Sequence, residues 1–282
     1  MKALAVAQPM SGPRHFARSI DPKRWLREAF ARQPLLTGFA VLMWLAMVPA
    51  LLALGLDERS LRGVSVWVKP LKFLASVGLF SISTAWFIGL LPDHRRDSLP
   101  VRVVVWTILL AGGFEIAYIT LMASLGQASH YNFSNAVHVA LYSAMGAGAL
   151  AMTATQPLLA WQIVRHGRGD LPSAWRDAVV LGLMLTFLLG AGAGGLLGGI
   201  QPPAGAGLPV VGWHLGGGDL RPAHFIGLHA QQFLPLAGLA LIALRVRRAR
   251  VALAVFALAY SALWGWAMLR GLEGAIRVVV PS

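Results

Sequence analysis

The sequence contains no cysteine. This excludes disulfides, thiolate-bound metals, iron–sulfur clusters and haem attached through a Cys-x-x-Cys-His motif. Histidines, of which there are eight, remain as candidates for any metal or haem site.

Charged residues are also scarce. Only 12% of the chain is Asp, Glu, Lys or Arg, against roughly 25% in ordinary soluble domains, while 57% is hydrophobic. A soluble fold of this composition would expose apolar side chains and aggregate, so we expect lipid to be the solvent. The net charge of +13 does not indicate nucleic-acid binding, because the charges fall in short clusters between long apolar runs, which is the pattern left by membrane insertion.

Seven apolar stretches have about the 20 residues that a helix needs to cross a bilayer. They run over 35–56, 66–91, 101–125, 137–164, 175–200, 221–244 and 250–275. The predicted fold is therefore all-α, a polytopic membrane protein with a seven-transmembrane-helix bundle as its single domain (34–276). A basic cytoplasmic or interfacial segment (1–33) precedes the bundle and a short outer tail (277–282) follows it. Proline and glycine break up residues 1–16, so we expect the first span to act as its own insertion signal.

Basic residues lie mainly on one side of these spans. With the N-terminus inside, 17 of the 24 Lys and Arg residues fall on the inner side, and all three inner loops are basic. This predicts a cytoplasmic N-terminus and an outer C-terminus. Before the first span, Asp21-Pro22 predicts the start of a short helix. Trp25 and Phe30 among basic residues favour its lying on the anionic inner leaflet, and a disordered basic tail is the alternative.

Polar residues that are rare in membrane spans gather on the outer side. The set comprises His130, His138, His214, His224, His229, Lys69, Lys72, Glu115, Asp219, Arg270 and Glu273. This one-sided gathering is the main functional signal in the sequence.

Three of these residues lie deep in their predicted spans. The helical rise places Lys72 about 9 Å, His229 about 12 Å and Glu115 about 15 Å from the outer ends. Ionisable groups at such depth usually face the bundle interior and find partners, so we expect the three to share one layer, with Lys72 and Glu115 as a pair. A protonated Glu115 and lysines that reach back to the surface are the alternatives.

The sixth span carries two histidines and Gln232. His224 and His229 are five residues apart, or about 140° around a helix, so they do not form a chelating pair on one face. His229 and Gln232 do share a face. A metal or haem site would therefore need a second helix that brings His138 or His130. The alternative is a structural hydrogen-bond network.

Two outer segments could form a roof over this region. The segment 201–220 is rich in glycine and proline and is long for a simple connection, and 126–136 is polar without charge. In the fifth span, Gly190, Gly194 and Gly198 repeat at every fourth position, which favours close helix packing.

Three segments together resemble a family of multi-pass bacterial inner-membrane proteins. They are Lys69-Pro-Leu-Lys72-Phe, Ser129-His130-Tyr-Asn132 and Gly217-Gly-Asp219-Leu-Arg221-Pro-Ala-His224-Phe-Ile-Gly-Leu-His229. The likeness covers most of the chain and implies a multi-pass fold in a bacterial inner membrane. It implies no mechanism, because that family has no established activity.

Two classes of function remain open. The first is a binding or transport protein for a small polar ligand or an ion, including a proton. Its pocket, open to the outer (periplasmic) side, would be lined by Lys72, Glu115, His138, His224, His229 and Gln232. The alternative is a membrane oxidoreductase with haem b or copper, held by His130 or His138 and by His224 or His229. A zinc-dependent lipid hydrolase is a third possibility. No paired-ligand spacing occurs, which favours binding or transport.

Overall fold

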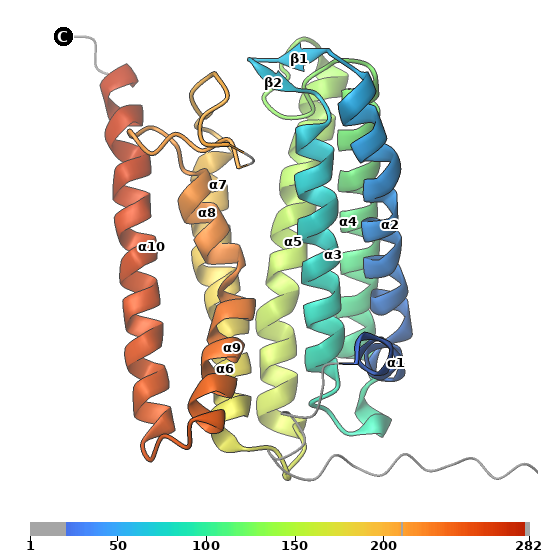
Figure 1. Ribbon diagram of the computed structural model, residues 1–282, viewed down its shortest axis with the longest axis vertical. Coiled ribbons are helices and arrows are strands. Elements are labelled where there is room, and N and C mark those ends of the chain that lie inside the picture. The colour runs from blue at the N-terminus through green and yellow to red at the C-terminus, as the bar shows by residue number, and fades with distance from the viewer. Residues whose placement is uncertain (1–20, 210, 280–282) are drawn as a thin grey trace, which may run out of the picture.

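The protein is described here from a computed structural model, which covers residues 21–209 and 211–279. Its helices stand side by side in a bundle (Figure 1). A short hairpin of β1 (Ser60–Leu61) and β2 (Val64–Ser65) lies at one end, which we call the hairpin end. Helix α1 (Pro22–Arg32) lies at the other, the α1 end. The predicted segments 1–33 and 277–282 lie partly outside the described residues.

Within the described residues, six helical runs are long and apolar enough to cross a membrane. They are α2 (Pro34–Leu56), α3 (Val68–Ile88), α4 (Leu99–Ser124), α5 (Ala136–His166), the continuous run of α6 (Ser173–Leu185), η3 (Thr186–Ala191) and α7 (Gly192–Leu197), and α10 (Ala249–Val279). A seventh span results if α8 (Arg221–Leu228) and α9 (Ala230–Ala243), which are bent by 50° at their junction, are counted as one. Each helical run matches a predicted apolar stretch to within a few residues.

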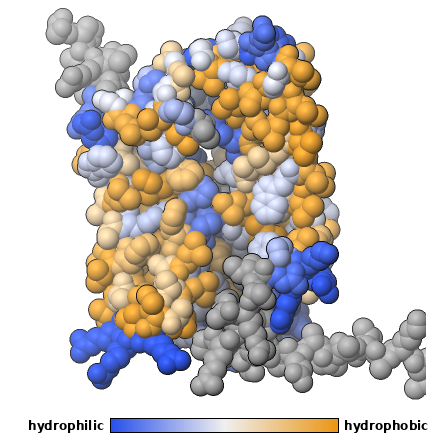
Figure 2. Space-filling model, viewed as in Figure 1, coloured by the Kyte–Doolittle hydropathy of each residue, from blue (hydrophilic) through white to orange (hydrophobic). Residues whose placement is uncertain are grey.

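The outward surface of the bundle is apolar between two polar ends. Large side chains such as Leu42, Leu52 and Leu258 are 57%, 63% and 72% exposed. A helix in water would turn a polar stripe outward instead. Figure 2 shows a mainly hydrophobic band, with strongly hydrophilic clusters at its ends. Lipid contact explains this arrangement.

The helices pack as two groups. In the first group α2 lies on α3 and α4 lies on α5, and in the second α6 lies on α9 while α8 and α9 lie on α10. The groups meet where α5 contacts α6 and η3 (Figure 1). The largest buried cluster crosses this junction, since it joins Leu36, Ile108 and Leu159 to Leu183.

Helix α1 is held against the C-terminal end of α3 by aromatic and charged contacts. The Asp21 side chain accepts from the Lys23 N–H at 3.0 Å, which confirms the predicted helix start. Arg32 donates to the Trp86 carbonyl at 2.9 Å and lies 4.0 Å above the Trp86 ring. Trp25 stacks on Trp86 with ring centroids 5.4 Å apart. These contacts hold α1 against the bundle.

Candidate functional site

The sixth predicted span is broken in its middle. His229 sits between α8 and α9 with φ −90° and ψ 5°, outside the helical region. Pro235 follows six residues later, inside α9. Proline lacks an N–H and crowds the carbonyl four residues before it, here that of Gln231. The break therefore lies two residues before the carbonyl that loses its helix partner to Pro235.

The break faces an irregular turn in the fifth span. Residues Thr186–Ala191 form η3, a π-helical turn, and α8 packs directly on it. Thr186 Oγ1 accepts from the Gln231 N–H at 2.9 Å and donates to the Leu228 carbonyl at 3.4 Å. His224 Nδ1 lies 3.0 Å from the Gly190 carbonyl oxygen. Side chains of each span thus form hydrogen bonds with backbone groups that lack a helix partner in the irregular part of the other span.

Glycine makes this contact possible. A Cβ on Gly227 would lie 2.5 Å from the Gly190 nitrogen, and a Cβ on Gly190 would lie 2.9 Å from Leu228 Cδ2. The predicted close packing at Gly190 is therefore present, with α8 as the partner. At Gly194 the nearest neighbour is the His224 ring, 2.9 Å from an added Cβ.

A chain of polar side chains leads from the break to the other helix group. His229 Nδ1 lies 3.2 Å from Gln232 Oε1, and Gln232 Nε2 donates to Ser83 Oγ on α3 at 3.0 Å. The predicted common face of His229 and Gln232 is confirmed. With Oε1 as acceptor, Nδ1 carries the proton, and Nε2 of the neutral ring keeps a free lone pair. Phe225 covers the His229 ring, with centroids 4.1 Å apart.

Gln231 is the most unusual group beside the break. Its residue is 1% exposed, and its Oε1 has no hydrogen-bond partner among the described residues. Leaving such a buried acceptor unpaired costs about 1–3 kcal/mol. Gln156 on α5 is in the same condition. The two glutamines lie about 18 Å and 15 Å from the ends of their helices at the α1 end.

The structure does not place Lys72, Glu115 and His229 in one layer. Lys72 Nζ donates to the Val211 carbonyl at 3.1 Å, at the hairpin end. His229 is linked instead to Ser83, which lies 11 residues, or about 16 Å, further along α3 than Lys72. The predicted layer is wrong because rise along a single helix does not reveal which neighbouring segment a residue meets, here Val211 for Lys72 and Ser83, through Gln232, for His229.

The predicted pair of Lys72 and Glu115 is not formed either. Among the described residues no ion pair joins them. Glu115 is 8% exposed and lies within electrostatic range of Lys69, one turn earlier on α3. Spacing alone could not choose between Lys69 and Lys72, because they share a face of the same helix.

Lys72 belongs to a second cluster, built on the segment between α7 and α8. Arg221 donates to both carboxylate oxygens of Asp219, at 2.8 Å and 2.7 Å, and to the Gly212 carbonyl at 2.6 Å. The Asp219 side chain is fully buried. Burial opposes its ionisation, but the bonds from Arg221 and from the His214 N–H outweigh this and lower the pKa of the carboxyl. Lys72 and Arg221 thus donate to two consecutive backbone carbonyls, at residues 211 and 212.

The two segments predicted to form a roof both lie at the hairpin end, and we keep the name roof for them. Tyr131, in the segment between α4 and α5, donates to the Leu197 carbonyl, and Tyr142 donates to the Gly198 carbonyl at 2.8 Å. Arg62 donates to the Pro202 carbonyl at 2.7 Å. The segment 198–220 is therefore attached to both helix groups. Sequence reasoning had noted Tyr131 only as part of the segment Ser129–Asn132 and had not singled out Tyr142 or Arg62.

The remaining predicted histidines occupy separate surroundings. His130 lies between Phe73 and Tyr142, with ring centroids 5.8 Å and 5.4 Å away. Burial, helped by the charge of Lys69, lowers the pKa of His130 well below 6.5. His138 Nδ1 contacts Tyr118 Oη at 3.2 Å. Among the described residues no three His, Asp or Glu side chains gather in a way that could hold a metal ion.

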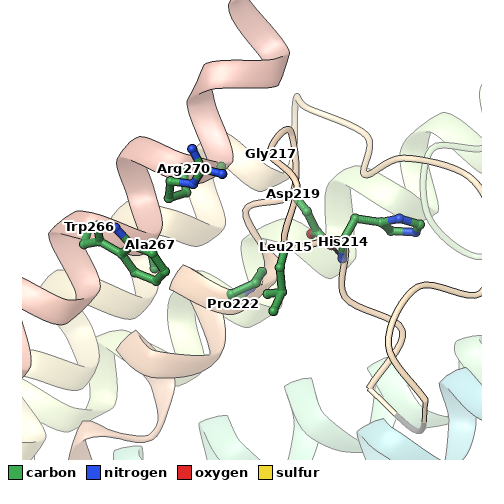
Figure 3. Close-up of a pocket in the computed structure, with 9 residues that line it drawn as sticks. His214, Leu215, Gly217, Asp219, Pro222, Trp266, Ala267 and Arg270 are labelled. Carbon is green, nitrogen blue, oxygen red and sulfur yellow. Dashed lines mark hydrogen bonds between the residues drawn. The ribbon is translucent and has the colours of Figure 1, made fainter.

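A small pocket lies at the hairpin end between the roof and α10 (Figure 3). His214, Asp219, Trp266 and Arg270 are among its lining residues. Its volume of about 30 Å³ leaves room for one or two waters. It is too small for a metabolite.

Comparisons with known families, with characterised proteins and with solved structures found no match to this chain. Its function therefore has to be argued from its own residues.

Proposed function

We propose that the chain is a seven-span protein of a bacterial inner membrane, with its N-terminus in the cytoplasm. Six helices and one bent pair that could cross a membrane support this. So does the charge bias, because the N-terminal segment and the three inner loops together carry 17 of the 24 basic residues. In this orientation the hairpin end faces the periplasm.

We further propose that the protein binds or transports a small polar ligand or an ion at the break between α8 and α9. The observation that carries the proposal is the buried, unpartnered Oε1 of Gln231 beside an interrupted span. Broken helices in membrane transporters form substrate and ion sites near the bilayer middle, where helix ends point at the bound species. His229, with a free ring nitrogen, supplies a second polar contact.

This proposal keeps three of the six residues that the sequence predicted for the ligand site and adds one. His224, His229 and Gln232 stay in it and Gln231 is added, because all four lie at or beside the break. Lys72 is assigned to the roof through which the ligand would enter from the periplasm. Glu115 and His138 lie on the other helix group and have no assigned contact with the ligand.

The first experiment measures thermal unfolding of purified full-length protein by the fluorescence of its ten tryptophans. The probes are sodium and potassium salts, small amino acids and small carboxylic acids. A ligand at 100 times its Kd stabilises the folded state by about 2.7 kcal/mol, so we expect at least one probe to raise the Tm by several degrees. The same probe should be taken up by proteoliposomes.

Variants separate a ligand site from a structural network. Gln231→Leu should raise the ligand-free Tm, because it removes an unpaired buried acceptor, and should abolish the shift caused by the probe. His229→Gln should also lose the shift. His94→Gln, at an exposed position of the α1 end, is the matched control and should keep it. No shift with any probe in the wild type, or an equal shift in Gln231→Leu, would contradict the proposal.

A further inference from the structure

A groove opens at the α1 end, where α6 and α10 begin. Ser173 and Ala174 line it from α6, and residues 247–251 line it from the turn into α10. Its volume is about 430 Å³, more than ten times that of the pocket in Figure 3. None of the residues discussed above for the break lines it. It is therefore a separate site.

The groove is strongly basic. Arg247 and Arg248 are exposed and form no ion pair among the described residues. Arg250 is paired with Asp177 on α6 at 2.6 Å, and Arg176 also contacts Asp177, at 3.5 Å. Since Asp177 already has two arginine partners, it does not neutralise the charges of Arg247 and Arg248. The groove thus carries net positive charge.

Two helix N-termini add to this charge. The first-turn N–H groups of a helix have no intrahelical partner and point outward with the positive end of the helix dipole. Helix α6 starts at Ser173 without a side-chain cap, and neither α6 nor α10 has an acidic residue in its first turn. Arginines beside open helix N-termini are suited to bind phosphate groups.

The surroundings of the groove favour a phosphate group that belongs to a lipid. Leu244 and Val251 flank the arginines and are 75% and 59% exposed. In Figure 2 the hydrophilic cluster below the α9–α10 turn lies directly under the hydrophobic band. A soluble phosphate compound would not use the apolar flank, whereas a phospholipid places acyl chains there and its headgroup at the arginines.

We propose that this groove binds the headgroup of an anionic phospholipid in the inner leaflet. Arg247, Arg248 and the free N–H groups of the two helix starts bind its phosphate oxygens, and the acyl chains lie along Leu244 and Val251. This inference rests on the proposed membrane spans and their orientation. It is independent of the ligand at the α8–α9 break.

The test is native mass spectrometry of full-length protein titrated with cardiolipin, phosphatidylglycerol and phosphatidylcholine. We expect retention of one cardiolipin or phosphatidylglycerol and weak retention of phosphatidylcholine. The double variant Arg247→Gln/Arg248→Gln should bind the anionic lipids about 25-fold more weakly, since each basic residue near the membrane contributes roughly a factor of five.

The matched control is Arg102→Gln/Arg165→Gln, which removes the same charge at the same end from exposed residues outside the groove. It should retain lipid like the wild type. Equal loss in both double variants, or no loss in either, would overturn the proposal. Binding of millimolar pyrophosphate by the wild type but not by Arg247→Gln/Arg248→Gln, with no preference for anionic lipid in the wild type, would also overturn it, because a free phosphate compound would then be the occupant. A failed ligand screen at the break leaves this experiment unaffected.

Discussion

Asp219 shows how a single buried carboxylate organises the hairpin end. It accepts from Arg221 and from the backbone N–H groups of His214 and Arg221. These bonds fix the start of α8 and position Arg221 for its contact with Gly212. The sequence predicts Asp219 as the cap of the sixth span, but Leu220 occupies the cap position of α8, and Asp219, one residue earlier, accepts from the N–H of the first helical residue, Arg221.

Replacing Asp219 by Asn should lower the stability of the protein at neutral pH. Breaking a fully buried ion pair costs about 3–5 kcal/mol, and because Arg221 is partly exposed we expect about 2 kcal/mol here. For a protein of this size the Tm should fall by about 5 °C. Tryptophan fluorescence in detergent measures the change.

The same variant should alter the response to acid. The folded-state pKa of Asp219 is lowered below its ordinary value of 3.8. Its stabilising effect is therefore present above pH 3.8 and is lost as the pH falls through the folded-state pKa. The Tm difference between wild type and Asp219→Asn should shrink on going from pH 7 to below pH 4. A difference that stays constant over this range would show that the charge of Asp219 contributes nothing.

The sequence predicted the depth of Glu115 but not that of Lys72. Glu115 is buried well inside α4, whereas Lys72 is the fifth residue of α3 and contacts the segment at the hairpin end. Their partners depend on the rotation and tilt of neighbouring helices and on the path of the segment 198–220. None of these is encoded in the spacing of the residues within one helix.

Two irregular elements, η3 and the α8–α9 junction, define the candidate site. The sequence predicted both spans as continuous helices, because hydropathy and length register only that a stretch is apolar. Pro235 was the available signal for the break, since a proline weakens the helix one turn before it. The π-helical turn has no such marker, because Thr186 acts through contacts with a different helix.

The contact between these elements gives a direct test of their packing. Gly227→Ala would place a Cβ 2.5 Å from the Gly190 backbone nitrogen, where no flexible side chain can move away. We expect a loss of about 1–3 kcal/mol from overpacking, seen as a lower Tm. Gly146→Ala, in α5 with no atom within 4 Å of the added Cβ, should instead gain roughly 0.5–1 kcal/mol from reduced backbone entropy. If the two variants behaved alike, α8 and η3 would not pack as described.

The arrangement of the whole molecule follows from patterns that the sequence carries locally. Apolar runs of membrane-spanning length, separated by loops of which every second one is basic, sufficed to predict the all-helical bundle. The division into two helix groups could not be predicted in this way, because it depends on which lipid-compatible faces pack together, and Leu or Val side chains suit either lipid or protein contact.

Orientation in the membrane can be measured because the chain contains no cysteine. Ser134→Cys and Gly169→Cys introduce single thiols at exposed positions of the hairpin end and the α1 end. A membrane-impermeant maleimide added to intact spheroplasts should label only the Ser134→Cys variant, because positive loops stay in the cytoplasm. Permeabilised cells should label both. Labelling of Gly169→Cys alone in intact spheroplasts would reverse the orientation, and equal labelling would refute the seven-span topology.

The hydrogen bonds from charged side chains to segment 198–220 restrict how the two helix groups can move relative to each other. Lys72 and Arg62 attach it to one helix group, and Arg221 attaches it to the other. Separating the groups at the hairpin end must therefore break hydrogen bonds from these charged side chains to backbone carbonyls. At the α1 end α5 and α6 are joined by the short segment 167–172, so the two groups stay covalently linked there while the contacts at the hairpin end can break.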